Sequence, residues 1–164
     1  LEFRRVLFRS EGPEAGVLDG VAGVTRLGSV SGEAVRGEMS RAVALVVPSI
    51  CYENFPRTIA EAFACGLPVI ASRIGALADI MRDGETGLLF DPGNPHDLAD
   101  KMGWALANPE RMAEMGRKAR AQYEAEFSAD VNYQRLMEIY GGVLAEQRQV
   151  KLASYKVQGS REEG

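Results

Sequence analysis

Two glutamates flank the expected start of a helix and could together hold the hydroxyl groups of a ligand. Glu53 lies in a loop after a predicted strand, and Glu61 lies about one and a half turns into a helix predicted over 56–65. Pro56 and the turn before it keep Glu53 outside that helix. The first-turn amides of a helix lack partners and lie at the positive end of its dipole, so they can bind a phosphate or diphosphate. Carboxylates beside that site would accept hydrogen bonds from sugar hydroxyls.

The same pair has a simpler structural interpretation. Acidic residues are common near helix starts because they complement the dipole, and two glutamates at this spacing often arise by chance. Other reactive side chains favour structural roles. His96, the single histidine, stands at a predicted helix start and is expected to be solvated, while Cys51 and Cys65 fit small reduced thiols. The elements and motifs around the glutamates therefore decide between the two interpretations.

Short apolar runs alternate with helical patterns along much of the chain. Val-Ala-Leu-Val-Val ends at Pro48, and Pro-Val-Ile-Ala lies between Gly66 and Ser72, as expected of buried parallel strands. We expect strands at 25–28, 43–47, 68–71 and 87–90, and helices at 33–42, 56–65, 77–82, 96–107, 109–127 and 129–147. This alternation predicts an α/β fold with a doubly wound parallel sheet, followed by C-terminal helices. Ligands of such a sheet lie beyond the carboxyl ends of its strands.

Composition and charge exclude several classes of function. Of the 164 residues, 46% are hydrophobic and 26% are charged, which fits one globular domain. The formal net charge is -4 and no basic run interleaves with aromatics, so nucleic-acid binding is not expected. No apolar stretch approaches the roughly 18 residues of a membrane span and no signal-peptide pattern is present, so we expect a cytoplasmic protein. The glycines lack the spacing of a dinucleotide fingerprint, which disfavours nicotinamide chemistry.

The segment around the two glutamates resembles the donor-binding half of glycosyltransferase family 4, a large group of retaining enzymes with the GT-B fold. The hallmark of that family is a pair of glutamates separated by seven residues, as Glu53 and Glu61 are. The similarity continues through Ala-Cys-Gly-Leu-Pro-Val-Ile-Ala-Ser at 64–72 and Thr-Gly-Leu-Leu-Phe at 86–90, and it covers roughly residues 11–140. The resemblance implies that the sheet is Rossmann-like and is the C-terminal half of a GT-B fold.

The resemblance also implies roles for residues of the loop and the helix. Glu53 would be the catalytic residue, contacting hydroxyls of the donor sugar and helping to hold it as the leaving group departs. Glu61 would accept hydrogen bonds from the ribose hydroxyls of the nucleotide. Backbone amides around four further residues would face the sugar and the diphosphate, where a helix end can neutralise developing charge: Asn54, Phe55, Arg57 and Thr58.

Several positions depart from the pattern of the family. Where its members often have Gly-Phe-Gly, this chain has Asn-Phe-Pro at 54–56, which leaves one fewer N–H donor. Gly75 is a candidate donor contact, but it is followed by Ala76 where a second glycine is frequent. Arg73 could reach a phosphate from the loop after the strand at 68–71, although an arginine in an exposed loop is more often simply solvated.

The function implied by the resemblance is transfer of a hexosyl unit, with retention, from a nucleotide-diphosphosugar to an acceptor that the sequence does not identify. A front-face displacement assisted by the leaving diphosphate would need no protein nucleophile and no cofactor. A metal ion is not expected, because the sequence lacks an Asp-x-Asp motif. The partners would be the donor and a sugar, lipid or other acceptor bound mainly by a missing N-terminal domain, and peripheral membrane association of the parent protein stays open. Two alternatives remain, namely a nucleotide-sugar-binding fragment without activity of its own and a GT-B-like epimerase.

The ends of the chain are typical of a fragment of something longer. The chain begins without Met, and Leu-Glu-Phe-Arg-Arg-Val-Leu-Phe-Arg-Ser at 1–10 lacks the apolar strand that the resemblance requires at this place. We therefore expect residues 1–10 to be foreign to the natural protein. Residues 11–149 would be a partial C-terminal nucleotide-sugar-binding domain, and residues 150–164 a flexible tail.

Overall fold

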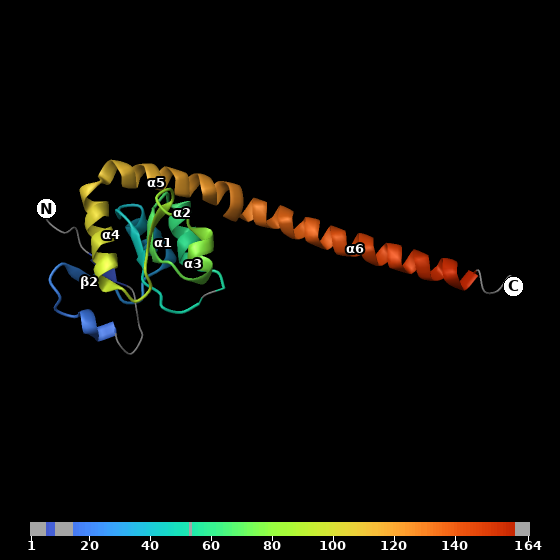
Figure 1. Ribbon diagram of the computed structural model, residues 1–164, viewed down its shortest axis with the longest axis horizontal. Helices are drawn as coiled ribbons and strands as arrows, with labels where there is room; N and C mark the ends of the chain where they lie inside the picture. The colour runs from blue at the N-terminus through green and yellow to red at the C-terminus, as the bar shows by residue number, and fades with distance from the viewer. Residues whose placement is uncertain (1–5, 9–14, 53, 160–164) are drawn as a thin grey trace.

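Short parallel strands form the centre of the molecule (Figure 1). The computed structural model describes residues 6–8, 15–52 and 54–159. Strands β1 (Val6–Phe8) and β2 (Val24–Arg26) form one sheet, and β3 (Leu45–Val47), β4 (Val69–Ser72) and β5 (Gly87–Phe90) form another in that order. Every pairing within these sheets is parallel. The predicted α/β fold is confirmed, although the described strands form two sheets instead of one.

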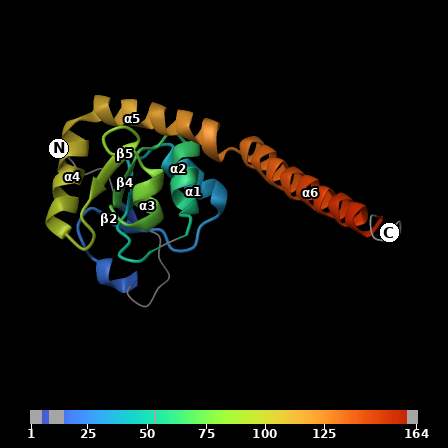
Figure 2. The ribbon, with the colours of Figure 1, turned by 45° about the vertical axis from the view of Figure 1, so that its right-hand side comes forward.

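Helices connect successive strands and extend the chain beyond the sheet. They are η1 (Ala15–Leu18), α1 (Gly32–Met39), α2 (Arg57–Ala64), α3 (Gly75–Ile80), α4 (Pro95–Ala107), α5 (Pro109–Gln122), the π-helical turn η2 (Tyr123–Phe127) and α6 (Ala129–Gly159). In two views, α6 runs outward from the rest of the molecule (Figure 1; Figure 2). Within the described ranges, no helix combines the length and the apolar character needed to cross a bilayer.

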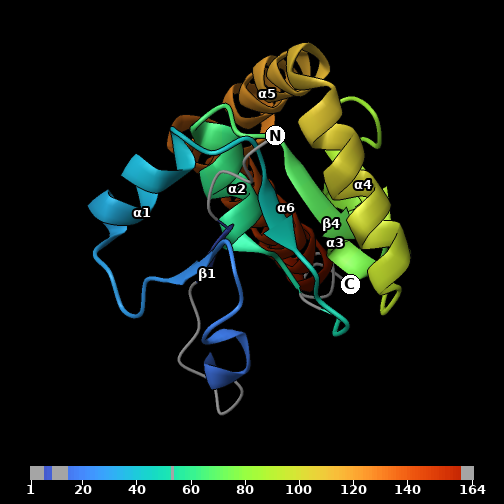
Figure 3. The same cartoon turned by 90° about the vertical axis from the view of Figure 1, so that its left-hand side faces the viewer.

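The side chains of β4 alternate between two apolar cores. Val69 and Ala71 join a cluster with residues of α2 and α3, whereas Ile70 joins a second cluster with residues of α4 and α5. This division follows from the period of two along a strand. Figure 3 shows α2 and α4 on opposite sides of β4. Because both faces are covered, β4 reads as a continuous apolar run, and the doubly wound arrangement predicted from such runs is confirmed.

The ends of α2 are set by two residues with special backbones. Pro56 is the N-cap, with φ -77° and ψ 91°, and no side chain caps the helix there. At the other end, Gly66 has φ +67°, and the Leu67 N–H donates to the Ala62 carbonyl at 2.9 Å. Glycine is favoured at this position because a Cβ would strain a left-handed backbone. Helix α2 therefore begins directly after the loop that leaves β3 and ends just before β4.

Some boundaries differ from the sequence prediction. Helix α5 gives way at Tyr123 to the π-helical turn, where an α-helix was expected to continue to 127. Helix α6 continues to Gly159, so its predicted end at 147 is wrong, and the helix formers Lys, Leu and Ala at 151–153 explain the extension. Val6–Phe8 form β1 although no strand was expected within 1–10, because their backbone groups pair with β2. The division of the chain at residues 10 and 149 stays a prediction.

Candidate functional site

The carboxyl ends of β3 and β4 place two loops at the same edge of the sheet. The two strands are parallel neighbours, with Val47 opposite Ala71. One loop, residues 48–56, leads from β3 into α2, and a shorter one leads from β4 into α3. The Ser49 hydroxyl accepts a hydrogen bond from the Cys51 N–H at 3.4 Å, which turns the first loop just after the strand. This edge is where doubly wound proteins bind their ligands.

The first turn of α2 offers backbone donors at this edge. The Ile59 N–H is used within the structure, because it donates to the Pro56 carbonyl at 2.9 Å. Pro56 has no N–H, and no side chain caps the turn. The N–H groups of Arg57 and Thr58, both exposed residues, are the donors that this turn can direct to an anion.

Glu61 lies one turn further along α2 and forms an ion pair with Arg57. The guanidinium Nη2 of Arg57 lies 3.3 Å from the Oε1 of Glu61, and the two side chains are 84% and 47% exposed. Exposed pairs of this spacing contribute only about 0.3–0.5 kcal/mol, so a ligand can replace either partner at small cost. The start of α2 therefore combines exposed first-turn amides with a guanidinium and a carboxylate.

Phe55 connects the loop after β3 to the π-helical turn η2. Its ring meets that of Phe127 edge to face, with centroids 5.9 Å apart and an interplanar angle of 62°. Phe55 remains half exposed, at 49%. Edge-to-face aromatic pairs contribute about 0.5–1.5 kcal/mol beyond the area that they bury. The entrance of α2 is thus held by a contact from a distant part of the chain.

Gly75 lies against Tyr52 of the neighbouring loop. A Cβ placed on Gly75 would lie 2.9 Å from Cδ1 of the tyrosine ring, closer than real Cβ contacts allow. The backbone of Gly75 also has φ +47°, a region that side chains disfavour. The two loops at the carboxyl edge therefore touch at a point that requires glycine.

Arg73 is directed toward Asp83 beside β5. Its Nη2 lies 2.7 Å from Oδ2 of the aspartate, and Oδ1 of the same carboxylate accepts the Leu89 N–H at 2.9 Å. Burial raises the pKa of Asp83, but the Leu89 N–H and the Arg73 guanidinium outweigh burial and hold that pKa below its ordinary value. The arrangement gives Arg73 a structural partner that the sequence did not reveal.

The predicted site residues thus fall into three groups. Arg57, Thr58 and Glu61 share the first turns of α2, and the exposed Asn54 and the partly exposed Phe55 lie in the loop that enters it. Gly75 lies at the adjacent loop, and Arg73, just before it, is paired with Asp83. Glu53 lies outside the described residues.

Sequence reasoning missed two aromatic residues of this region, Tyr52 and Phe127. Neither belongs to the glutamate motif, and their contacts join segments that are distant in the sequence. The available signal for Tyr52 was an aromatic residue directly before Glu53.

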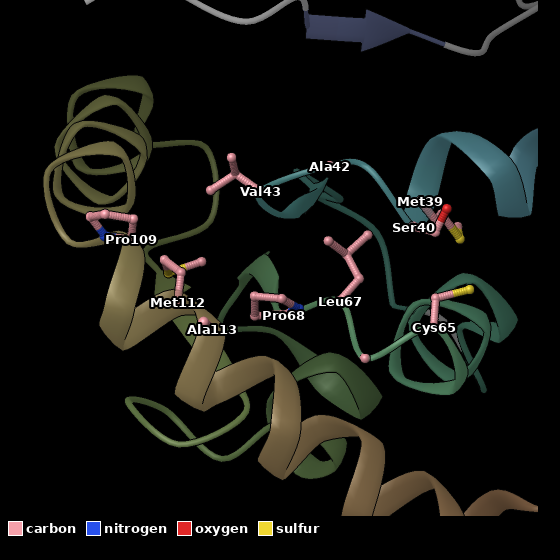
Figure 4. Close-up of a pocket in the computed structure, with 11 residues that line it drawn as sticks. Met39, Ser40, Ala42, Val43, Cys65, Leu67, Pro68, Pro109, Met112 and Ala113 are labelled. Atoms are coloured by element: carbon pink, nitrogen blue, oxygen red, sulfur yellow. The ribbon is translucent and has the colours of Figure 1, made fainter.

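A hollow of about 230 Å³ lies at the opposite end of β4 (Figure 4). It is lined mainly by apolar side chains, among them Met39, Leu67, Pro68 and Met112, and none of its lining residues is charged. Such a lining does not suit a charged nucleotide. Among the described residues, no three His, Cys, Asp or Glu side chains gather as a metal site would require.

A sequence model of the family described as glycosyl transferases group 1 matches residues 18–122. The chain belongs to this family. The matched region begins before β2 and ends with α5, so it contains both loops of the carboxyl edge. The group 1 assignment agrees with the fold and with the presence of a helix start at that edge.

Curated relatives of this group 1 chain are glycosyltransferases. An uncharacterized glycosyltransferase from Methanocaldococcus jannaschii is 35% identical over 112 residues, which are 68% of this chain and 31% of the relative. A D-inositol 3-phosphate glycosyltransferase from Acidothermus cellulolyticus is 36% identical over 111 residues, which are 68% of this chain and 24% of the relative. The chain therefore matches only 24–31% of the length of these proteins.

Solved structures of GT-B glycosyltransferases resemble the fold. Sucrose-phosphate synthase from Thermosynechococcus elongatus matches with a TM-score of 0.78 and 29% identity, over 87% of this chain and 39% of the synthase. The Anabaena protein HepE, solved in complex with UDP, matches with a TM-score of 0.69 and 25% identity, over 73% of this chain and 32% of HepE. The fold thus matches about a third of the length of these solved glycosyltransferases.

Proposed function

We propose that this chain is the donor-binding part of a retaining glycosyltransferase of family 4, which transfers a hexosyl unit from a nucleotide-diphosphosugar. The observation that carries the proposal is the first turn of α2. Its Arg57 and Thr58 amides lie at the carboxyl edge of a parallel sheet, with the carboxylate of Glu61 one turn away. The group 1 family and the UDP complex of HepE support a nucleotide donor for this edge.

The order of the binding groups along α2 suggests which part of the donor each group contacts. The diphosphate would accept hydrogen bonds from the amides of Arg57 and Thr58, at the positive end of the helix dipole. Glu61 would accept from the ribose hydroxyls, on the nucleotide side of the diphosphate. The Arg57 guanidinium, released from its exposed pair with Glu61, would add positive charge beside the diphosphate.

The hexosyl unit would lie on the loop side of the diphosphate, near Asn54 and Phe55, where we propose that Glu53 binds its hydroxyls. In the reaction, the bond between the sugar and the diphosphate oxygen breaks and its electron pair leaves with the diphosphate. The acceptor hydroxyl bonds to the sugar from the same face and gives its proton to the departing oxygen. Amides fixed at the helix end would stabilise the negative charge as it develops. Gly75 would permit close approach from the second loop.

Because the chain matches only part of the length of its relatives, we assign donor binding and sugar transfer to different lengths of protein. Since the chain spans 31% and 24% of the two curated relatives, we propose transfer for a protein that includes the remaining length. For the 164-residue chain itself, we propose donor binding without transfer. We propose that the longer protein binds the acceptor, which is a sugar, a lipid or another molecule. The proposed cytoplasmic location also applies to that longer protein.

Calorimetric titration tests the proposal. The chain is titrated with UDP, GDP and ADP and with their hexose derivatives, beside the variants Glu61→Ala and Glu114→Ala. Glu114 is a matched control, because it is a partly exposed helical glutamate on α5 that pairs with Arg111 at 2.8 Å and with Lys118 at 3.4 Å. We expect one nucleotide series to bind and Glu61→Ala to weaken that binding about 10-fold to 100-fold, as loss of a hydrogen bond to a charged group predicts. Glu114→Ala should bind as the unaltered chain does.

Two results would contradict the proposal. One is a folded chain that binds none of the three nucleotide series. The other is equal affinity in Glu61→Ala and the unaltered chain, which would remove the carboxylate from the binding site. Glu53→Ala separates the two ends of the donor, because it should weaken binding of the hexose derivatives and leave binding of the free diphosphates unchanged.

A further inference from the structure

The ring of Tyr52 is highly exposed at the carboxyl edge. It is 83% exposed, and its ring lies beside Gly75. The ring atoms nearest to a Cβ built on Gly75 are Cδ1, Cε1 and Cγ, which form one edge of the ring. Because only that edge is seated, the faces of the ring remain open to solvent. An exposed aromatic ring on a fixed loop is typical of a surface that binds another ring.

The position of Tyr52 beside the second loop depends on Gly75. At position 75 any side chain would begin 2.9 Å from the ring, and the backbone there has φ +47°. Because Gly75 has no side chain and a left-handed backbone, the loop after β4 can lie close to Tyr52. In the loop after β3, a turn at Ser49 lies just before Tyr52, since the Ser49 hydroxyl bonds to both the N–H and the carbonyl of Cys51.

We infer that Tyr52 is a specificity-determining residue whose ring stacks on the hexosyl ring of the donor. The inference rests on the proposed function and deepens it. In that proposal Glu61 holds the ribose, Arg57 and Thr58 hold the diphosphate, and the sugar lies toward the loop. Tyr52 lies in the loop that enters α2, before these residues, and its ring lies beside Gly75, so we assign it to the sugar end of the donor and not to the base end.

The chemistry of a hexose explains why an aromatic ring would select among donors. One face of a pyranose in which most hydroxyls are equatorial carries several C–H groups, and these are attracted to the negative face of an aromatic ring. An axial hydroxyl on that face interrupts the apolar patch and would lose its water against the ring. Tyr52 would therefore favour hexoses by the orientation of their hydroxyls.

Paired titrations test the inference. UDP, GDP and ADP are each titrated beside UDP-glucose, GDP-mannose and ADP-glucose, into the unaltered chain and into Tyr52→Ala, Tyr52→Phe and Ile50→Ala. Ile50 is the matched control, since it is a large exposed side chain of the same loop, at 71%. We expect Tyr52→Ala to bind the hexose derivative about threefold to tenfold more weakly and the free diphosphate unchanged. Tyr52→Phe and Ile50→Ala should match the unaltered chain.

The outcomes separate this inference from the proposed function. Equal affinity of Tyr52→Ala and the unaltered chain for the hexose derivative overturns the stacking role, while sensitivity to Glu61→Ala keeps the donor site in place. Equal weakening of the free diphosphate and its hexose derivative also overturns it, because the ring would then act on the nucleotide or on the loop. A folded chain that binds no nucleotide overturns both proposals.

Discussion

The rings of Phe55 and Phe127 meet edge to face, 5.9 Å between centroids, and join the entrance of α2 to the π-helical turn η2. Phe55 directly precedes the N-cap Pro56, so the contact bears on the position of the Arg57 and Thr58 amides. A π-helical turn is an uncommon element that often accompanies functional sites. Here it turns the end of α5 toward the loop of the candidate donor site.

Removal of that aromatic pair should loosen the loop without unfolding the chain. We predict that Phe127→Ala lowers the free energy of unfolding by about 1–3 kcal/mol, through lost burial and the lost aromatic contact. Amide hydrogen exchange at residues 54–58 should accelerate more than exchange in β4. The control is Tyr133→Ala, which removes a ring that is 63% exposed on α6. Unchanged exchange at 54–58 in Phe127→Ala would show that the pair does not hold the loop.

Gly87 at the start of β5 should tolerate no side chain. A Cβ at this position would lie 2.0 Å from the Val69 carbonyl oxygen and 2.6 Å from the Met81 methyl. Because the first of these neighbours is backbone of the adjacent strand, we predict that Gly87→Ala lowers the unfolding free energy by about 3 kcal/mol or more. Gly103→Ala in α4 is the control, because nothing lies within 4 Å of its Cβ position. Equal free energies of unfolding for the two variants, measured by denaturant unfolding, would contradict this packing.

Acid should weaken the Asp83 contacts. The folded state lowers the pKa of Asp83, so its carboxylate stabilises the fold at pH above the ordinary value of 3.8. That contribution is lost as the pH falls through the lower pKa of the folded state. We predict that Asp83→Asn is less stable than the unaltered chain near neutral pH, and that the difference shrinks on acidification. Asp79→Asn, at an exposed position of α3, is the control for denaturant curves recorded across this range.

The local elements of the fold could be predicted from sequence because each has a local cause. The apolar run at β4, the proline before α2 and the glycine after it are visible without any structure. The same is true of Glu61 and the first turn beside it, whose positions follow from the helix start.

The long-range contacts could not be predicted in this way. The seating of Tyr52 on Gly75, the pair of Phe55 with Phe127 and the pairing of Arg73 with Asp83 depend on the folded chain. The extension of α6 to Gly159 was missed because the residues there have helix propensity without an apolar period. Sequence patterns thus located the start of α2, whereas the structure was needed to show which side chains meet around it.

An amide NMR titration of the labelled chain with UDP, GDP and ADP tests most directly whether the first turn of α2 binds the diphosphate. We predict that one of these nucleotides shifts the backbone resonances of Arg57 and Thr58 more than those of residues that line the hollow, such as Met112. In Glu61→Ala, the same shifts should require a higher nucleotide concentration. A folded chain in which the Arg57 and Thr58 amides stay unchanged at saturating concentrations of all three nucleotides would contradict the account.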